Sequence, residues 1–271
     1  MRRVGIALSL LVTAVTFLAC SDGGGPLPDG GSPDMIVADS TIGKGDLSAI
    51  GDASPAQTCA PSIQLIGRVD PARMLADIKS LVGLFERSSH TGQQAAAAYL
   101  RDQLSKLSGV TLKEQKYQYL GKEYVNFEAT ITGAVEPDRF ILIGSHYDST
   151  SKDPKIAPGA DDDASGTAAL LEAARALAGC RPARSVRLLF FSNEEKGIVG
   201  ATAYVNALKA VLPPSKVIGY INVDMIGYGP ADEDLDLATK PAQRAFADQM
   251  ATAVEKWTSL KVKKRISDHC G

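Results

Sequence analysis

Acidic residues follow three separate apolar runs of this sequence. His146 and Asp148 come after the run 139–143, Glu194 and Glu195 after 186–191, and Asp224 after 217–223. Charged side chains at the end of a buried strand cost free energy unless a partner compensates them. Because one imidazole and several carboxylates would meet at one edge of a sheet, we predict that the compensating partner is a metal ion.

The apolar runs alternate with segments of helical periodicity. Helices are predicted over about 71–82, 92–104, 165–177, 201–211 and 240–260, and strands over 110–119, 125–131, 140–143, 187–191 and 217–223. Three of the strands are apolar enough to be buried on both faces, which is typical of a parallel arrangement. The predicted fold class is therefore α/β, a mixed sheet with parallel central strands sandwiched by helices.

In such sheets, ligands bind outside the carboxyl ends of the central strands. These ends carry His146, Glu194, Glu195 and Asp224, and Asp162 lies in the loop that leaves the first of them. Each residue also has a simpler interpretation: a loop histidine, surface charge at the start of a helix, or a buried structural acid. Asp163 is predicted to be the N-cap of the following helix. One shared site accounts for all the strand ends together, and we prefer it.

The N-terminal segment reads as a targeting signal. Residues 1–20 have a charged start and an apolar core, and the apolar run 4–19 is short for a membrane span. Its end at Cys20 resembles a bacterial lipoprotein signal; the alternative is an ordinary signal peptide with an incidental cysteine. We predict an exported protein, either membrane-anchored by lipid on Cys20 or secreted or periplasmic. Residues 21–61 are predicted to form a Gly/Pro/Ser/Asp-rich flexible tether, with the domain itself over 62–271.

Charge and cysteine content narrow the possible partners. The formal net charge of −2, together with the lack of a basic patch, argues against binding to nucleic acid. The chain has four cysteines, so three remain if Cys20 carries lipid. Export favours a disulfide among them. Cys59 and Cys180 are the expected pair, although spacing alone leaves the pairing open.

Four sequence blocks carry the candidate site residues. They are 146–149 (His-Tyr-Asp-Ser), 158–166, 194–200 and 222–227. In content, order and spacing they resemble the zinc aminopeptidases of peptidase family M28, and the similarity runs from about residue 69 to the C-terminus, including Arg87. The resemblance implies a zinc-exopeptidase-like fold, two Zn²⁺ ions and a peptide substrate. The implied activity is metal-dependent hydrolysis of peptide bonds, with release of N-terminal amino acids.

The resemblance also implies a role for each site residue. Asp162 would bridge the two zinc ions, His146 and Asp224 would complete the shell of one ion, and Glu195 would bind the other. Glu194 would be the general base, which takes a proton from water and delivers it to the leaving amine. Asp148 would hold the far nitrogen of His146 and fix its tautomer.

One departure from the family concerns its remaining ligand, a histidine in a His-Thr block. Ser267-Asp268-His269 matches the Ser-Asp-His block that precedes it in the family, no His-Thr block follows, and His90 lies in a predicted turn after Ser89. We therefore expect one complete zinc site, a second ion left with Glu195 and a share of Asp162, and a domain lacking its C-terminal part. The alternatives are a glutaminyl-cyclase-like acyltransferase and an inactive metal- or peptide-binding lipoprotein.

Overall fold

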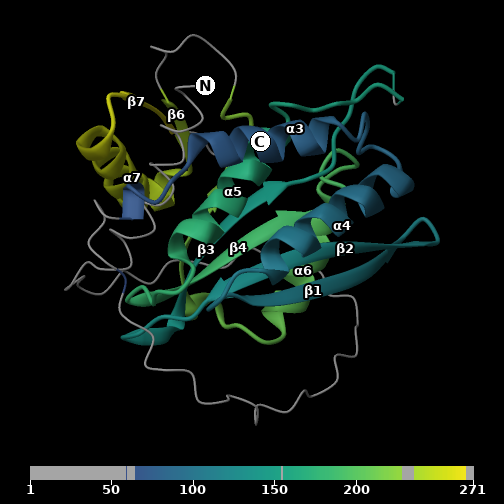
Figure 1. The fold of residues 1–271 in the computed structure, drawn as a ribbon. Coiled ribbons are helices and arrows are strands. Elements are labelled where there is room, and N and C mark those ends of the chain that lie inside the picture. The colour runs from purple at the N-terminus through teal and green to yellow at the C-terminus, as the bar shows by residue number, and fades with distance from the viewer. Residues whose placement is uncertain (1–58, 60–64, 154, 228–234, 267–271) are drawn as a thin grey trace.

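The computed structural model describes residues 59, 65–153, 155–227 and 235–266, arranged as helices around a mixed sheet (Figure 1). The elements in chain order are α3 (Pro71–Val82), α4 (His90–Ser105), β1 (Thr111–Tyr119), β2 (Lys122–Ile131), β3 (Glu136–His146), α5 (Ala164–Leu177), β4 (Arg184–Phe191), α6 (Val199–Lys209), β5 (Val217–Asn222), β6 (Leu235–Thr239), α7 (Arg244–Trp257) and β7 (Val262–Ile266). Within these residues, no helix combines the length and apolar character needed to cross a membrane. The signal segment, Cys20, most of the predicted tether and the block 267–269 lie outside the described residues.

The main sheet has five strands in the order β1-β2-β4-β3-β5. β3 pairs in parallel with both β4 and β5, while β2 pairs antiparallel with β1 and β4. The predicted mixed sheet with parallel central strands is therefore confirmed. Because β3, β4 and β5 run in one direction, their carboxyl ends all lie at the same edge.

Helices cover both faces of this sheet. α4 and α5 pack on one face, α3 packs on α5, and α6 lies on the other face against β1 and β2 (Figure 1). The alternation within β3 shows why: Ile141 and Ile143 join the core under α5, whereas Leu142 joins the smaller core under α6. A strand that sends apolar side chains to both faces needs a helix layer on each.

Helix starts follow the local sequence. Asp70 caps α3 by accepting a 2.8 Å hydrogen bond from the N–H of Ala72, and Pro71 occupies the first helical position, as predicted. The second helix was predicted to begin at about residue 92, with His90 in the turn before it. This was wrong, because α4 begins at His90. The Ser89 side chain accepts from the N–H of Gly92 at 3.0 Å and so caps the helix two residues earlier.

Two predictions about the C-terminal elements need correction. Burial of β5 on both faces is wrong: Ile221 is its one buried residue and Tyr220 is 47% exposed, since β5 is the edge strand of the described sheet. The predicted helix 240–260 is shorter, as α7, and lies between two unpredicted strands. These strands, β6 and β7, pair in parallel with each other and pack on α7 beside the main sheet (Figure 1).

A disulfide joins Cys59 to Cys180, the pair expected from the sequence. Cys180 lies between the end of α5 and the start of β4, so the bond sits at the amino end of the parallel strands. The N–H of Cys59 also donates to the carbonyl of Arg181 at 2.9 Å. The segment before α3 is thereby fixed to the domain at the end of the sheet remote from the acidic residues.

We expect Cys59→Ser to lower the free energy of unfolding by about 2–4 kcal/mol, because the bond closes a long loop in the unfolded chain. The sequence separation of the two cysteines is 121 residues. Urea unfolding of the variant and of the wild type checks this. Wild-type protein in the presence of a reductant should lose a similar amount. Equal stability of variant, reduced and oxidised protein would contradict the prediction.

Candidate metal centre

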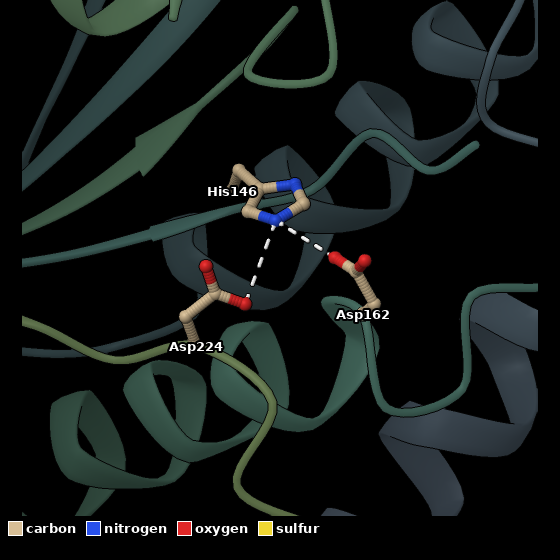
Figure 2. Close-up of side chains that lie close together, drawn as sticks. All are labelled: His146, Asp162 and Asp224. Carbon is tan, nitrogen blue, oxygen red and sulfur yellow. Dashed lines mark ion pairs between the residues drawn. The ribbon is translucent and has the colours of Figure 1, made fainter. Parts of the chain in front are cut away.

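The carboxyl ends of β3, β4 and β5 bring the candidate residues to one place. His146 is the last residue of β3, Glu194 and Glu195 follow β4, and Asp224 follows β5. Asp162 comes from the loop between β3 and α5. In Figure 2 the carboxylates of Asp162 and Asp224 both point toward the imidazole of His146.

Three of these side chains lie close enough to share one ion. Nε2 of His146 is 3.1 Å from Oδ1 of Asp162 and 3.8 Å from Oδ1 of Asp224 (Figure 2). The candidate ligand atoms of the three residues all lie within 4.8 Å of one another. His146 is 3% exposed, whereas the side chains of Asp162 and Asp224 are 44% and 38% exposed. The imidazole therefore lies at the buried side of the cluster, and the two carboxylates lie at the side that is open to solvent.

The general-base candidate lies beside this group. Oε2 of Glu194 is 3.9 Å from Nε2 of His146, and its side chain is 38% exposed. Glu195 is the next residue and has a buried oxygen, Oε1, that has no hydrogen-bond partner among the described residues. A buried, unpartnered carboxylate oxygen is costly, and it points to a missing cation rather than to a structural role.

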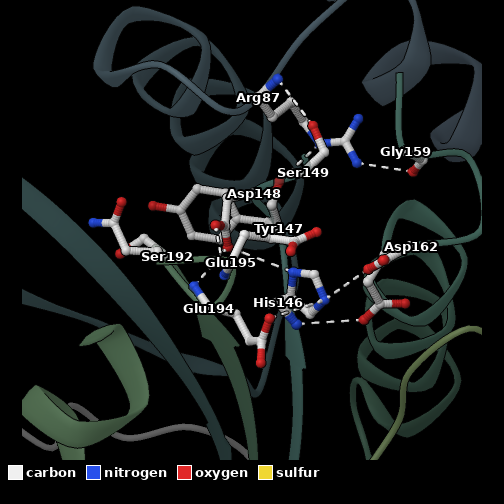
Figure 3. A network of polar contacts seen from close by, with 12 residues as sticks. Arg87, His146, Tyr147, Asp148, Ser149, Gly159, Asp162, Ser192, Glu194 and Glu195 are labelled. Carbon is white, nitrogen blue, oxygen red and sulfur yellow. Dashed lines mark hydrogen bonds and ion pairs between the residues drawn. The ribbon is translucent and has the colours of Figure 1, made fainter. Parts of the chain in front are cut away.

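Asp148 links the imidazole to the glutamate turn. Its carboxylate is fully buried, with Oδ1 at 3.4 Å from Nδ1 of His146. The same carboxylate accepts the backbone N–H of Glu194 at 2.9 Å and that of Glu195 at 3.2 Å (Figure 3). One acid therefore contacts the histidine ring and holds the backbone of the turn that carries both glutamates.

The backbone of His146 is held from the helix side. The hydroxyl of Thr167 donates to its carbonyl at 2.7 Å, and its N–H donates to Oδ2 of Asp163 at 3.3 Å. Asp163 also caps α5, accepting from the N–H of Gly166 at 2.8 Å, as expected for this position. The middle aspartate of the triplet faces the site while the third serves the helix. The peptide bond between Asp162 and Asp163 is cis.

A buried arginine holds the loop that carries Asp162. The guanidinium of Arg87 is fully buried and donates to the carbonyls of Tyr147 (2.8 Å), Pro158 (2.6 Å) and Gly159 (2.9 Å) (Figure 3). Burial lowers the pKa of Arg87 to about 10, which still leaves it charged at neutral pH. No role for Arg87 could be predicted from the sequence, because its partners are backbone carbonyls distant along the chain.

Asn193 supports the turn that carries the glutamates. It has φ of +52°, a conformation that asparagine tolerates better than most residues. Its buried side chain accepts from Nε2 of Gln93 at 2.8 Å and donates to the hydroxyl of Tyr117 at 2.9 Å. This residue was also missed in the sequence, where an asparagine before two glutamates carries no recognisable signal.

The electrostatics of the site favour a bound cation. Burial, reinforced by Asp162, raises the pKa of Glu195 to about 7, and burial also raises the pKa of Glu194. Burial alone would lower the pKa of His146, but the carboxylates around it raise that pKa strongly. An imidazole with several carboxylates is a donor set that zinc accepts. The residues present therefore fit a zinc ion.

Comparison with known proteins identifies the family. The sequence model of peptidase family M28 matches residues 126–270, just over half of the 271 residues. The chain belongs to peptidase family M28. The match includes all four of the blocks singled out in the sequence, and several relatives are named probable zinc metalloproteases.

Several curated relatives match parts of this M28 chain. Leupeptin-inactivating enzyme 1 of Streptomyces exfoliatus is 32% identical over 187 residues, covering 65% of this chain and 41% of that protein. A probable aminopeptidase of Saccharomyces cerevisiae is 29% identical over 216 residues, covering 73% and 56%. A probable zinc metalloprotease of Pyrenophora tritici-repentis is 38% identical over 109 residues, covering 39% and 25%. The chain thus spans from a quarter to just over half the length of these relatives.

Solved structures share the fold at lower identity. LapB from Legionella pneumophila superposes with a TM-score of 0.63 at 22% identity, covering 77% of this chain and 57% of LapB. A Zn-dependent exopeptidase from Parabacteroides distasonis gives 0.54 at 20% identity, covering 74% and 78%. A glutaminyl cyclase from Bacteroides thetaiotaomicron gives 0.53 at 19% identity, covering 73% and 78%.

We expect a second zinc ion, which would depend on Glu195, to bind more tightly as the pH rises from 4.5 toward about 7, the interval over which the pKa of Glu195 is raised. A proton held by the raised pKa must leave before the carboxylate can bind metal, so low pH competes with zinc. Competition against a chromophoric chelator at several pH values measures this. Glu195→Gln should flatten part of the dependence. A zinc affinity that stays constant over the interval would contradict the prediction.

Proposed function

We propose that this chain hydrolyses peptide bonds and releases N-terminal amino acids, with zinc held by His146, Asp162 and Asp224. The single observation that carries the proposal is this three-residue cluster with the free carboxylate of Glu194 beside it, 3.9 Å from the imidazole. Membership of the M28 family and the zinc metalloproteases among its relatives support the same reading.

The residues divide the chemistry between them. Zinc, when bound, supplies a Lewis acid that polarises the scissile carbonyl and acidifies water. Glu194 takes a proton from the attacking water and passes it to the leaving amine. Burial raises its pKa, which suits a group that must both accept and release a proton. Asp148 holds Glu194 by its backbone N–H and keeps the imidazole of His146 in place.

One zinc ion should bind more tightly than any second ion. His146, Asp162 and Asp224 offer three ligands of mixed type, an open arrangement that leaves room for water. Among the described residues, a second ion would depend on Glu195 and a share of Asp162. These two carboxylates repel each other, as the contribution of Asp162 to the raised pKa of Glu195 indicates. Carboxylates without an imidazole bind zinc less well.

The charge of the site supports the amino end of a peptide as the group that is recognised. The half-exposed side chains that border the imidazole are the carboxylates of Asp162, Glu194 and Asp224. With zinc bound to Asp162 and Asp224, the carboxylate of Glu194 remains as negative charge that attracts an ammonium group and repels a C-terminal carboxylate. Arg87 is buried with its donors directed at backbone carbonyls, which leaves it no face for a substrate carboxylate.

Cyclisation of N-terminal glutamine is the second candidate. A glutaminyl cyclase shares the fold, and the single three-residue cluster needs only one ion. The two activities differ in product: hydrolysis frees an amino acid from a peptide, whereas cyclisation frees ammonia from a glutaminyl peptide. Measuring both products with one panel of peptides decides between them. Zinc binding without either product would indicate a binding protein.

We expect Glu194→Gln to lower kcat/KM by about 10²–10⁴-fold on aminoacyl substrates, the usual effect of losing a general base. Bound zinc should stay at about one ion per chain after dialysis, because Glu194 is assigned as a base and not as a ligand. Glu123→Gln is the matched control, since Glu123 is an exposed residue paired with Lys116. Near-normal turnover by the Glu194→Gln variant would show that Glu194 is not the general base.

The membrane association proposed for this chain depends on Cys20, which lies outside the described residues. We expect Cys20 to become the mature N-terminus and to carry lipid, with the segment up to the disulfide-bonded Cys59 as the tether. Mass spectrometry of the exported protein checks the acyl mass, and Cys20→Ser should release the protein from membranes. A mature N-terminus downstream of Cys20 without acyl mass would refute the anchor.

A further inference from the structure

The two loops that carry Asp162 and Asp224 are tied together by a small set of hydrogen bonds. Asp161, which precedes Asp162, accepts the backbone N–H of Gly227 on its Oδ1 at 2.6 Å. Gly227 follows Asp224 by three residues in the loop after β5. A side chain on one loop therefore holds the backbone of the other.

Ser165 makes the second tie between the same loops. Its hydroxyl accepts the N–H of Ile226 at 3.1 Å. It also donates toward Asp161, with the carbonyl oxygen at 2.8 Å and Oδ1 at 3.1 Å. Two consecutive backbone N–H groups, those of Ile226 and Gly227, thus end on Ser165 and Asp161. We call these four residues the loop clasp.

The backbone segments around the loop clasp are closely packed. A Cβ added to Gly166 would lie 2.5 Å from the carbonyl oxygen of Val223, so the start of α5 touches the end of β5 directly. A Cβ on Gly227 would lie 3.1 Å from Oδ1 of Asp161. Met225, between the ligand and the clasp, has φ of +50° and turns the chain sharply. The position of Asp224 therefore depends on where the clasp holds the loop.

We propose that Asp161 is a positioning residue that sets the spacing of Asp162 and Asp224 and thereby the zinc affinity of the centre. Asp161 lies outside the cluster of His146, Asp162 and Asp224, and its Oδ1 accepts from the N–H of Gly227 and from the hydroxyl of Ser165. The proposal rests on the proposed function only in taking zinc as the bound ion. Ligand positions must be kept within a few tenths of an ångström for tight binding, and residues behind the ligands provide this.

The test compares Asp161→Ala with Asp161→Asn, using Zn²⁺ alone and a competing chromophoric chelator. Alanine removes the acceptor for Gly227, and zinc affinity should fall by about 10–100-fold. Asparagine keeps an oxygen at the same position, so its zinc affinity should stay close to the wild-type value. The visible absorption of the Co²⁺-substituted protein should change in the alanine variant and return in the asparagine variant.

Ser165→Ala is an independent variant, because it removes the acceptor for Ile226 and leaves Asp161 in place. The Ser165→Ala variant should also bind zinc more weakly than the wild type. If Asp161→Ala does not fold, Ser165→Ala provides the test in its place. The unfolding midpoints of the metal-free proteins show whether each variant is folded. Wild-type zinc affinity in the folded clasp variants overturns the proposal, as does an asparagine variant as weak as alanine. If the wild-type protein binds no more zinc than the His146→Ala variant, the proposed function is overturned instead of this proposal.

Discussion

The buried carboxylate of Asp148 is the contact on which the rest of the site depends. It lies 3.4 Å from the imidazole of His146 and accepts the consecutive N–H groups of Glu194 and Glu195. Through it, the end of β3 and the turn after β4 become one rigid unit. The hydrogen bonds to its oxygens make up for the cost of removing a carboxylate from water.

The site gathers more negative charge than the metal-free fold can neutralise. Several carboxylates surround one imidazole, and the raised pKa of Glu195 shows that they are not fully compensated. Natural proteins accept such local conflicts where function requires them and stabilise them from elsewhere. Here the supporting contacts come from the core side: Arg87 clamps one loop, and Asp163 and Thr167 hold the backbone of His146. A stable scaffold thus keeps mutually repelling groups together.

The sequence predicted what local pattern determines. Apolar runs located β3, β4 and β5, and the acids that follow them located the edge where the cluster forms. It missed β6 and β7 because each is short, β7 carries three consecutive basic residues, 263–265, and among the described strands the two pair only with each other. Asn193 was not singled out, and Arg87 was included in the family resemblance without a role. Their roles depend on partners far along the chain, and no local spacing records such contacts.

The Cys59–Cys180 bond determines at which end of the sheet the N-terminal segment joins the domain. The bond lies at the amino end of β4, and the metal centre lies at the carboxyl end of that strand, roughly 25 Å away for eight residues. A force on the chain before Cys59 would therefore reach the domain at the end of the sheet remote from His146. Under the proposed lipid anchor, a tether that joins the domain at Cys59 would leave the edge that carries His146 on the side remote from the point of attachment.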